Sequence, residues 1–156
     1  MIDIDQLDKR SRESQKDEII KAITESSPHT EEQVAACWEA IQQGELMVWE
    51  ISRDKDIIAL MLVQLRSQRA GQSIRKGLLI YAFRATVVVK QEEWAEGMAK
   101  TKDLAKRAGC DEIIANTANP VIGQVLESDG WMAMKTYRIE LDKKLIEEGP
   151  AITVPK

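Results

Sequence analysis

The longest uninterrupted apolar run in the sequence, Ile57 to Val63, restricts the fold more than any other feature. A membrane-spanning helix needs about 20 such residues, so this run is too short to be one. Its extension to Leu65 keeps apolar residues on both faces, as in an interior strand covered by helices on one or both sides. We therefore expect this segment at the centre of a sheet in an α/β protein.

Two further strands are expected beside the central one. Leu46 to Ile51 precedes it across a polar turn, and Leu78 to Phe83 follows it and can run on to Val89. The residues between them, Arg66 to Gln72, are polar and are predicted to form a connection. These segments predict three consecutive strands of antiparallel type.

Helical periodicity predicts the remaining elements. A charged N-terminal helix carries Ile19, Ile20 and Ile23 on one side, and a capping box at Thr30–Gln33 starts a second helix that ends at Gly44. The other predicted elements, in order, are a long helix over Glu92–Ala108, a strand over Asp111–Asn116, a short helix over Val121–Ser128 capped by Asn119 and Pro120, and a strand over Met132–Leu141.

The chain length of 156 residues predicts a single domain. Residues 1–29 are expected to form a charged amphipathic helical segment, residues 30–146 the core, and residues 147–156 a C-terminal tail. The fold class expected is α/β, with a central, mixed, mostly antiparallel sheet flanked by helices and preceded by a helical N-terminus.

Composition excludes several functions. With 22 Lys and Arg against 26 Asp and Glu, the net charge of −4 argues against nucleic-acid binding. The acidic N-terminus lacks a signal-peptide pattern, so we expect a soluble, cytoplasmic protein. Cys37 and Cys110 are expected as reduced, packed thiols, and His29, the only histidine, as a solvated loop residue. One histidine leaves little basis for a metal site, and none is expected.

The segment Asn119 to Trp131 resembles the second signature of the GNAT acetyltransferase superfamily, N-x-x-A-x-x-x-Y-x-x-x-G-F. Asn119, Gly130 and the aromatic Trp131 match in spacing, and the order of predicted elements is also similar to that superfamily. The resemblance implies a GNAT-like fold in which a loop before the long helix holds the pyrophosphate of acetyl-CoA through backbone N–H groups.

The loop itself departs from the pattern [Q/R]-x-x-G-x-[G/A] that the resemblance implies. The corresponding residues are Val89, Lys90, Gln91, Glu92, Glu93 and Trp94, and none of the three defining positions matches. Two like charges about 4 Å apart repel by roughly 4 kcal/mol at a surface-like dielectric, so Glu92 and Glu93 oppose a phosphate there. Acidic residues also suit a helix N-terminus without any ligand. The Trp94 ring is a candidate to plug the cleft for the pantetheine arm.

A second departure concerns Leu126, which replaces a tyrosine that in many relatives protonates the leaving thiolate. Tyr137 is no evident substitute. Glu45, Glu50 and Glu112 remain open as general bases. Asn116 and Asn119 can either bond the backbone at the strand junction or contact a ligand, and the structural role is favoured.

We therefore expect a GNAT-like protein that has lost acetyl-CoA binding, has no catalytic residues and needs no cofactor. It would act as a protein-binding or structural module, through Ile19, Ile20 and Ile23, toward a protein partner or a second copy. The alternative is an active acyl-CoA-dependent N-acetyltransferase that binds acetyl-CoA through a divergent loop. The chain also resembles small GNAT-like proteins of tailed phages, which implies possible incorporation into a phage particle.

Overall fold

The computed structural model describes residues 1–26, 29–117, 119–134, 137 and 139. In chain order the elements are β1 (Ile2–Gln6), α1 (Lys9–Ser14), α2 (Lys16–Ser26), α3 (Glu31–Gln42), β2 (Met47–Arg53), β3 (Asp56–Ala70), β4 (Ser73–Ala85), α4 (Gln91–Arg107), β5 (Glu112–Ala115) and α5 (Pro120–Ser128). Among these residues no helix is both long and apolar enough to cross a membrane.

The five strands form one mixed sheet in the order β1-β2-β3-β4-β5. The first four pair antiparallel, and β5 pairs parallel to β4 after the α4 crossover. The predicted central strand is confirmed, because Leu60, Leu62 and Val63 of β3 are almost completely buried. The prediction of a single α/β domain with a mostly antiparallel sheet is also confirmed.

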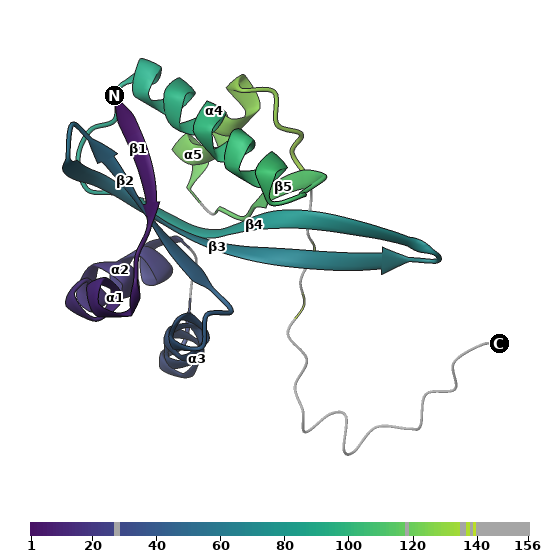
Figure 1. Ribbon diagram of the computed structural model, residues 1–156, viewed down its shortest axis with the longest axis horizontal. Coiled ribbons are helices and arrows are strands. Elements are labelled where there is room, and N and C mark those ends of the chain that lie inside the picture. The colour runs from purple at the N-terminus through teal and green to yellow at the C-terminus, as the bar shows by residue number, and fades with distance from the viewer. Residues whose placement is uncertain (27–28, 118, 135–136, 138, 140–156) are drawn as a thin grey trace.

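Helices cover both faces of the sheet (Figure 1). Helices α1, α2 and α3 lie on one face, and α4 and α5 lie on the other. Residues of α2 and α3 form a first core with residues of the strands, and Ala105 of α4 packs with other strand residues in a second core. The first core comprises Leu7, Ile19, Ala22, Ile23, Trp38, Ile41, Leu46, Val48, Leu60, Leu62 and Ala82. The second comprises Ile2, Ile51, Ile58, Ala59, Met61, Val63, Leu78, Ile80 and Ala105.

The helix starts follow their predicted caps. Thr30 Oγ1 accepts the N–H of Gln33, and Gln33 Oε1 accepts the N–H of Thr30, which confirms the capping box of α3. Asn119 Oδ1 accepts the N–H of Val121 at the start of α5, with Pro120 in the first turn. These bonds satisfy N–H groups that have no partner inside a helix.

The N-terminal segment is not a helical unit separate from the core, so that expectation for residues 1–29 is wrong. Ile2–Gln6 is a strand that pairs with β2 along its whole length. Ile19 and Ile23 of α2 are 0% exposed and belong to the first core, while Ile20 is only half-buried. The predicted exposed partner-binding stripe of Ile19, Ile20 and Ile23 is therefore absent, because the sheet itself buries two of the three side chains.

The polar segment Arg66–Gln72 is not a loop as predicted. The strands continue through it to Ala70 and restart at Ser73, and Gly71 at φ +61 makes the tight turn. Residues 65–76 are exposed on both faces, so no apolar alternation marks them as strand. Beyond Ala85 the predicted extension of β4 to Val89 does not form.

Half of the predicted strand Met132–Leu141 lies outside the described residues. Those of its residues that the structure does describe, 132–134, 137 and 139, form neither helix nor strand. The predicted tail, residues 147–156, lies wholly outside the described residues. The boundary at residue 146 therefore stays a prediction.

Candidate functional site

The two parallel strands β4 and β5 separate near the middle of the sheet. Their pairing runs from Gly77↔Glu112 to Ile80↔Ala115, and the N–H of Asn116 then donates to the Ile80 carbonyl at 3.4 Å. Immediately after this point β4 carries a bulge, since Leu62 faces Ala82 and Val63 faces Ile80, which leaves Tyr81 without a partner on β3. A bulge bends a strand and increases its twist. β4 continues five residues past Ile80 without β5 beside it.

An apolar cavity of about 70 Å³ lies where these strands separate, beneath α4 and α5. Small-molecule sites usually measure about 300–1,000 Å³, so this cavity is too small for a pantetheine arm as the side chains stand. Its lining consists of Ile51, Ile58, Ala59, Met61, Ile80, Phe83, Val89, Glu93, Trp94, Gly97, Met98, Thr101, Ala115, Ile122 and Leu126.

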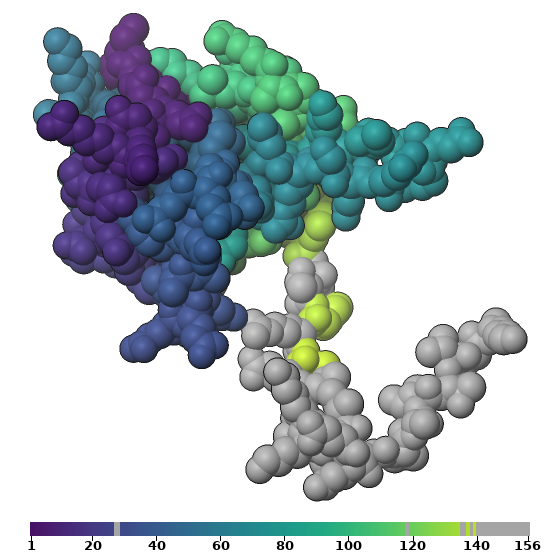
Figure 2. Space-filling model, turned by 60° about the horizontal axis from the view of Figure 1, so that its bottom comes forward, coloured from purple at the N-terminus to yellow at the C-terminus, as the bar shows by residue number. Residues whose placement is uncertain are grey.

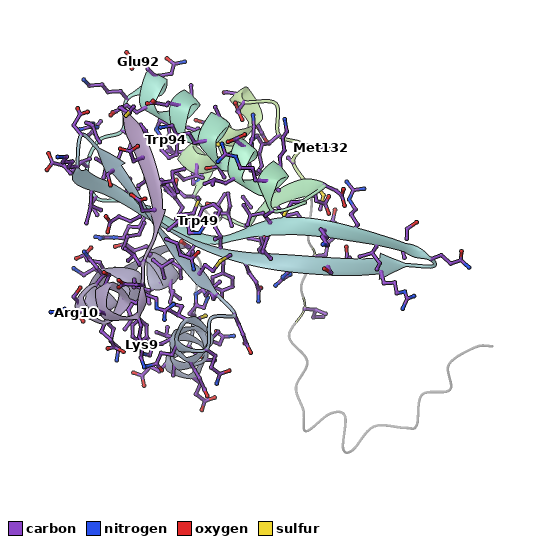
Figure 3. All side chains as sticks on the ribbon, in the orientation of Figure 1. Lys9, Arg10, Trp49, Glu92, Trp94 and Met132 are labelled. Carbon is purple, nitrogen blue, oxygen red and sulfur yellow. The ribbon has the colours of Figure 1, made fainter. Side chains whose placement is uncertain are left out.

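Two aromatic side chains occupy much of the space between α4 and β4. The Trp94 and Phe83 rings pack with centroids 5.2 Å apart at an interplanar angle of 41°. Both side chains line the cavity, and Figure 3 shows Trp94 at the junction of α4 with the sheet, while Glu92 lies at the outer end of the helix. Trp94 thus narrows the opening at its α4 side.

The N-terminus of α4 is occupied by the chain's own carboxylate. Glu93 Oε1 accepts the N–H of Lys90 at 2.9 Å and a bond from Arg53 Nη2 at 2.6 Å. A second bond from Arg53 Nε reaches Glu93 Oε2, and Arg53 Nη2 also donates to the carbonyl of Val88. These bonds, that from Arg53 first, lower the pKa of Glu93 to about 2. Glu93 is therefore ionised near neutral pH and its charge is already paired.

Several solved structures with this architecture are described as acetyltransferases. A Staphylococcus aureus GNAT family acetyltransferase has a TM-score of 0.60 and 15% identity, covering 90% of this chain and 98% of that chain. The aminoglycoside acetyltransferase AAC(6')-Iy, solved with a bisubstrate analogue, has a TM-score of 0.62 and 16% identity, covering 91% and 98%. A protein from Clostridium acetobutylicum, described as a predicted acetyltransferase and solved with acetyl-CoA, has a TM-score of 0.61 and 16% identity, covering 94% and 98%. The chain has the GNAT fold.

Sequence comparison adds no closer relationship. No protein-family model matches the chain, and no curated protein matches it. Identities of 12–16% among the similar structures establish the fold alone.

The GNAT fold implies acetyl-CoA at this opening, and the residues present do not fit its diphosphate. A diphosphate needs free backbone N–H groups and room for the backbone to approach it closely. Here the Glu93 carboxylate holds the Lys90 N–H, a second carboxylate at Glu92 is exposed beside it, and a tryptophan stands where the family pattern has Gly or Ala. Lys90 and Arg53 supply positive charge nearby, but Arg53 is engaged by Glu93.

The residues of the second signature lie near the point where β4 and β5 separate, and each has a structural role there. Leu126 lines the cavity and its carbonyl accepts the N–H of Trp131 at 3.1 Å. Gly130 has φ +90, a conformation that favours glycine, and closes the turn after α5. Trp131 Nε1 donates to Asp129, and Asn119 caps α5, in agreement with its structural interpretation.

The three carboxylates left open as general bases are not brought together. Glu45 is exposed, and Glu112 pairs with Arg75 at 3.1 Å. Burial, and then the neighbouring Asp5, raises the pKa of Glu50. None of the three lines the apolar cavity beneath α4 and α5, and Glu93 is the one acidic side chain among the described residues that line it.

A polar cluster on the opposite face was not predicted. Tyr81, the bulge residue of β4, lies with its hydroxyl 2.7 Å from His29 Nε2 and 3.3 Å from Cys37 Sγ. The expectation that His29 is solvated in a loop is therefore wrong, because it packs against Tyr81 and is half-buried. Burial, and then the bond from Cys37, raises the pKa of Tyr81 to about 12. The partners are 44 and 52 residues apart, so no local pattern could reveal them.

Both cysteines are free thiols, as expected. Burial raises the pKa of Cys110, which favours an unreactive thiol. Among the described residues no group of three or more His, Cys, Asp or Glu side chains is placed to hold a metal ion.

Proposed function

We propose that this chain is a non-catalytic GNAT-fold protein that does not use acetyl-CoA and acts as a binding or structural module. The observation that carries the proposal is the Glu93 carboxylate, which holds the Lys90 N–H and the Arg53 guanidinium at the start of α4. A diphosphate at that position must displace a paired charge and meet a second carboxylate at Glu92.

The Trp94 and Phe83 side chains, which fill the space between α4 and β4, independently support the same proposal. A pantetheine arm between β4 and β5 would have to separate the Trp94 and Phe83 rings, which now pack at 5.2 Å. The ring contact and its apolar surroundings stabilise the closed arrangement, whereas a cofactor site is usually largely formed before its ligand binds.

The test is thermal unfolding of the full chain with acetyl-CoA up to millimolar concentration. A ligand present at a hundred times its dissociation constant stabilises a fold by about 2.7 kcal/mol. For a domain of this size that corresponds to a rise in Tm of roughly 5–10 °C. We expect no saturable rise.

The control is the variant Arg53→Met, which leaves the Glu93 carboxylate unpaired and must bind acetyl-CoA no better than the unaltered chain. A saturable rise in Tm for the unaltered chain, together with transfer of labelled acetyl to an amine, would overturn the proposal.

The second candidate is an acyl-CoA-dependent N-acetyltransferase with a divergent loop. It is favoured by the apolar cavity at the β4–β5 separation and by the acetyltransferases among the similar structures. In that case Trp94 must move away from Phe83 when the cofactor enters. Quenching of tryptophan fluorescence that saturates with acetyl-CoA, and disappears in Trp94→Phe, would support this candidate over the first.

The resemblance to small phage-encoded proteins extends the first proposal to a structural role in a particle. Mass spectrometry of purified virions tests it: the chain at a fixed copy number per particle is the expected result, and its presence only in the infected-cell lysate opposes it.

A further inference from the structure

The most exposed part of the molecule is the β3–β4 ribbon, defined here as residues 64–76. It extends past the rest of the sheet in Figures 1 and 2. The register from Leu65↔Leu78 to Ala70↔Ser73 is regular, so the ribbon is an ordered hairpin. Every residue from Leu65 to Lys76 is exposed.

Cations and apolar side chains share one face of this ribbon. Cross-strand partners lie on the same face, and alternate residues along a strand do too. The register pairs Ser67 with Lys76 and Arg69 with Ile74, which places Arg69, Ile74 and Lys76 on the face that also carries Leu65. Leu65 is 51% exposed and Ile74 is 62% exposed. Arg69 forms no ion pair with any described residue.

The ribbon lies in a stretch of sequence with positive charge only. Between Asp56 and Glu92 there is no acidic residue, although the whole chain has a net charge of −4. The two large apolar side chains and the two cations alternate along this face, since Leu65 lies at its base, Lys76 comes next, and Ile74 lies opposite Arg69 at the outer end. A surface of this kind favours a partner that is acidic and has small residues at its centre.

Helix α3 has that chemistry. Between Lys21 and Arg53 the sequence contains no lysine or arginine. Glu32 and Glu39 on α3 are exposed, and so are the small residues Ala35 and Ala36 between them. None of the ion pairs within the described part of the chain uses these two carboxylates.

The β1 edge of the sheet is engaged by the chain itself at its start. The N–H of Ile2 donates to Glu96, and Lys100 donates to the Ile2 carbonyl, so side chains of α4 occupy this end of the edge. Helix α4 itself carries both signs, with acidic residues in its first turn and basic residues in its last. Of the helices α3 and α4, only α3 complements the ribbon in charge.

We propose that the β3–β4 ribbon of one copy docks on the exposed face of α3 in a second copy, through Arg69, Lys76, Leu65 and Ile74. Each copy offers one ribbon and one α3, so the contact can be reciprocal and close as a symmetric dimer. Reciprocity also doubles the contact, because each copy contributes one face of its ribbon and the exposed face of its α3. This inference is independent of cofactor binding.

Sedimentation velocity on charge-reversed full-length chains tests the proposal. At low salt the unaltered chain is expected to dimerise, and more weakly at 500 mM salt because ions screen exposed charges. Arg69→Glu and Glu39→Lys should each weaken dimerisation by at least tenfold. A one-to-one mixture of the two variants should dimerise again, because in the mixed pair each reversed charge meets an opposite one.

Matched controls lie on the same elements or on the opposite face of the molecule. Arg66→Glu makes the same charge change as Arg69→Glu, but on the other face of the ribbon. Glu127→Lys makes the same charge change as Glu39→Lys, but on α5. Neither should change the dimer. Ile74→Ser should weaken the dimer with no change in charge. Circular dichroism confirms that each variant is folded.

Three results would overturn the proposal. They are a monomer at every concentration tested at low salt, a dimer that resists Arg69→Glu while Arg66→Glu disrupts it, and a variant mixture that stays monomeric. A ribbon that instead binds a DNA duplex with the same Arg69 dependence, without dimerisation, would also overturn it in favour of a nucleic-acid partner.

Discussion

Substitution of Ile23 tests whether helix α2 belongs to the common core. The Ile23 side chain is 0% exposed and packs in the first core together with Ile19. Ile23→Ala removes three buried carbons at about 0.8 kcal/mol each, and the cavity that remains adds to the loss. We expect the free energy of unfolding to fall by about 3–4 kcal/mol, and Tm by roughly 6–15 °C.

Urea denaturation and calorimetry supply the measurement. Ile139→Ala is the matched control, because it makes the same chemical change at a position that is 81% exposed and should cost less than about 1 kcal/mol. A loss below about 1 kcal/mol for Ile23→Ala, or a separate early unfolding transition for residues 1–26, would refute the placement of α2 in the common core.

Three further outcomes follow from individual contacts. Glu93→Gln should be less stable than the unaltered chain at pH 7. Because the pKa of Glu93 is depressed to about 2, the difference in free energy of unfolding between the two chains should be complete above about pH 5 and vanish as the pH falls toward 2. Denaturation measured across this pH range checks the prediction. Thr30→Ala should lower the free energy of unfolding by about 1 kcal/mol by removing the α3 cap, while Thr30→Ser retains it. Arg84→Met should loosen α2, which Arg84 ties to β4 through Glu18 and Glu25, and so speed amide exchange in α2 more than in α4.

The sequence predicted the elements whose patterns are local. The Thr30–Gln33 capping box, the Asn119 cap and the apolar centre of β3 each depend on residues close together in the chain, and the structure confirms all three. Strand β1 was missed although Ile2 and Ile4 alternate with Asp3 and Asp5, since an alternation over five residues is a weak signal.

What the sequence could not predict depends on contacts between distant segments. Arg53 reaches Glu93 across 40 residues, and its pairing decides the state of the α4 N-terminus. The ribbon beyond Leu65 has no buried face, so the hydrophobic pattern that identifies strands is missing there. The sequence identified Glu93 as an acidic residue at the start of the long helix. It did not identify Arg53 as the partner that neutralises it.

The contact between Trp94 and Phe83 also bears on how readily this chain could acquire acetyl-CoA binding. The GNAT pattern has a small residue where this chain has Trp94, and the Trp94 ring is packed on Phe83. Replacing a tryptophan by alanine in a core costs about 3–5 kcal/mol, toward the low end here because Trp94 is only half-buried. That is a large part of the 5–15 kcal/mol that stabilises a typical domain. Under the proposed function, acetyl-CoA binding would therefore need a compensating gain elsewhere in the core together with removal of the charges at Glu92 and Glu93.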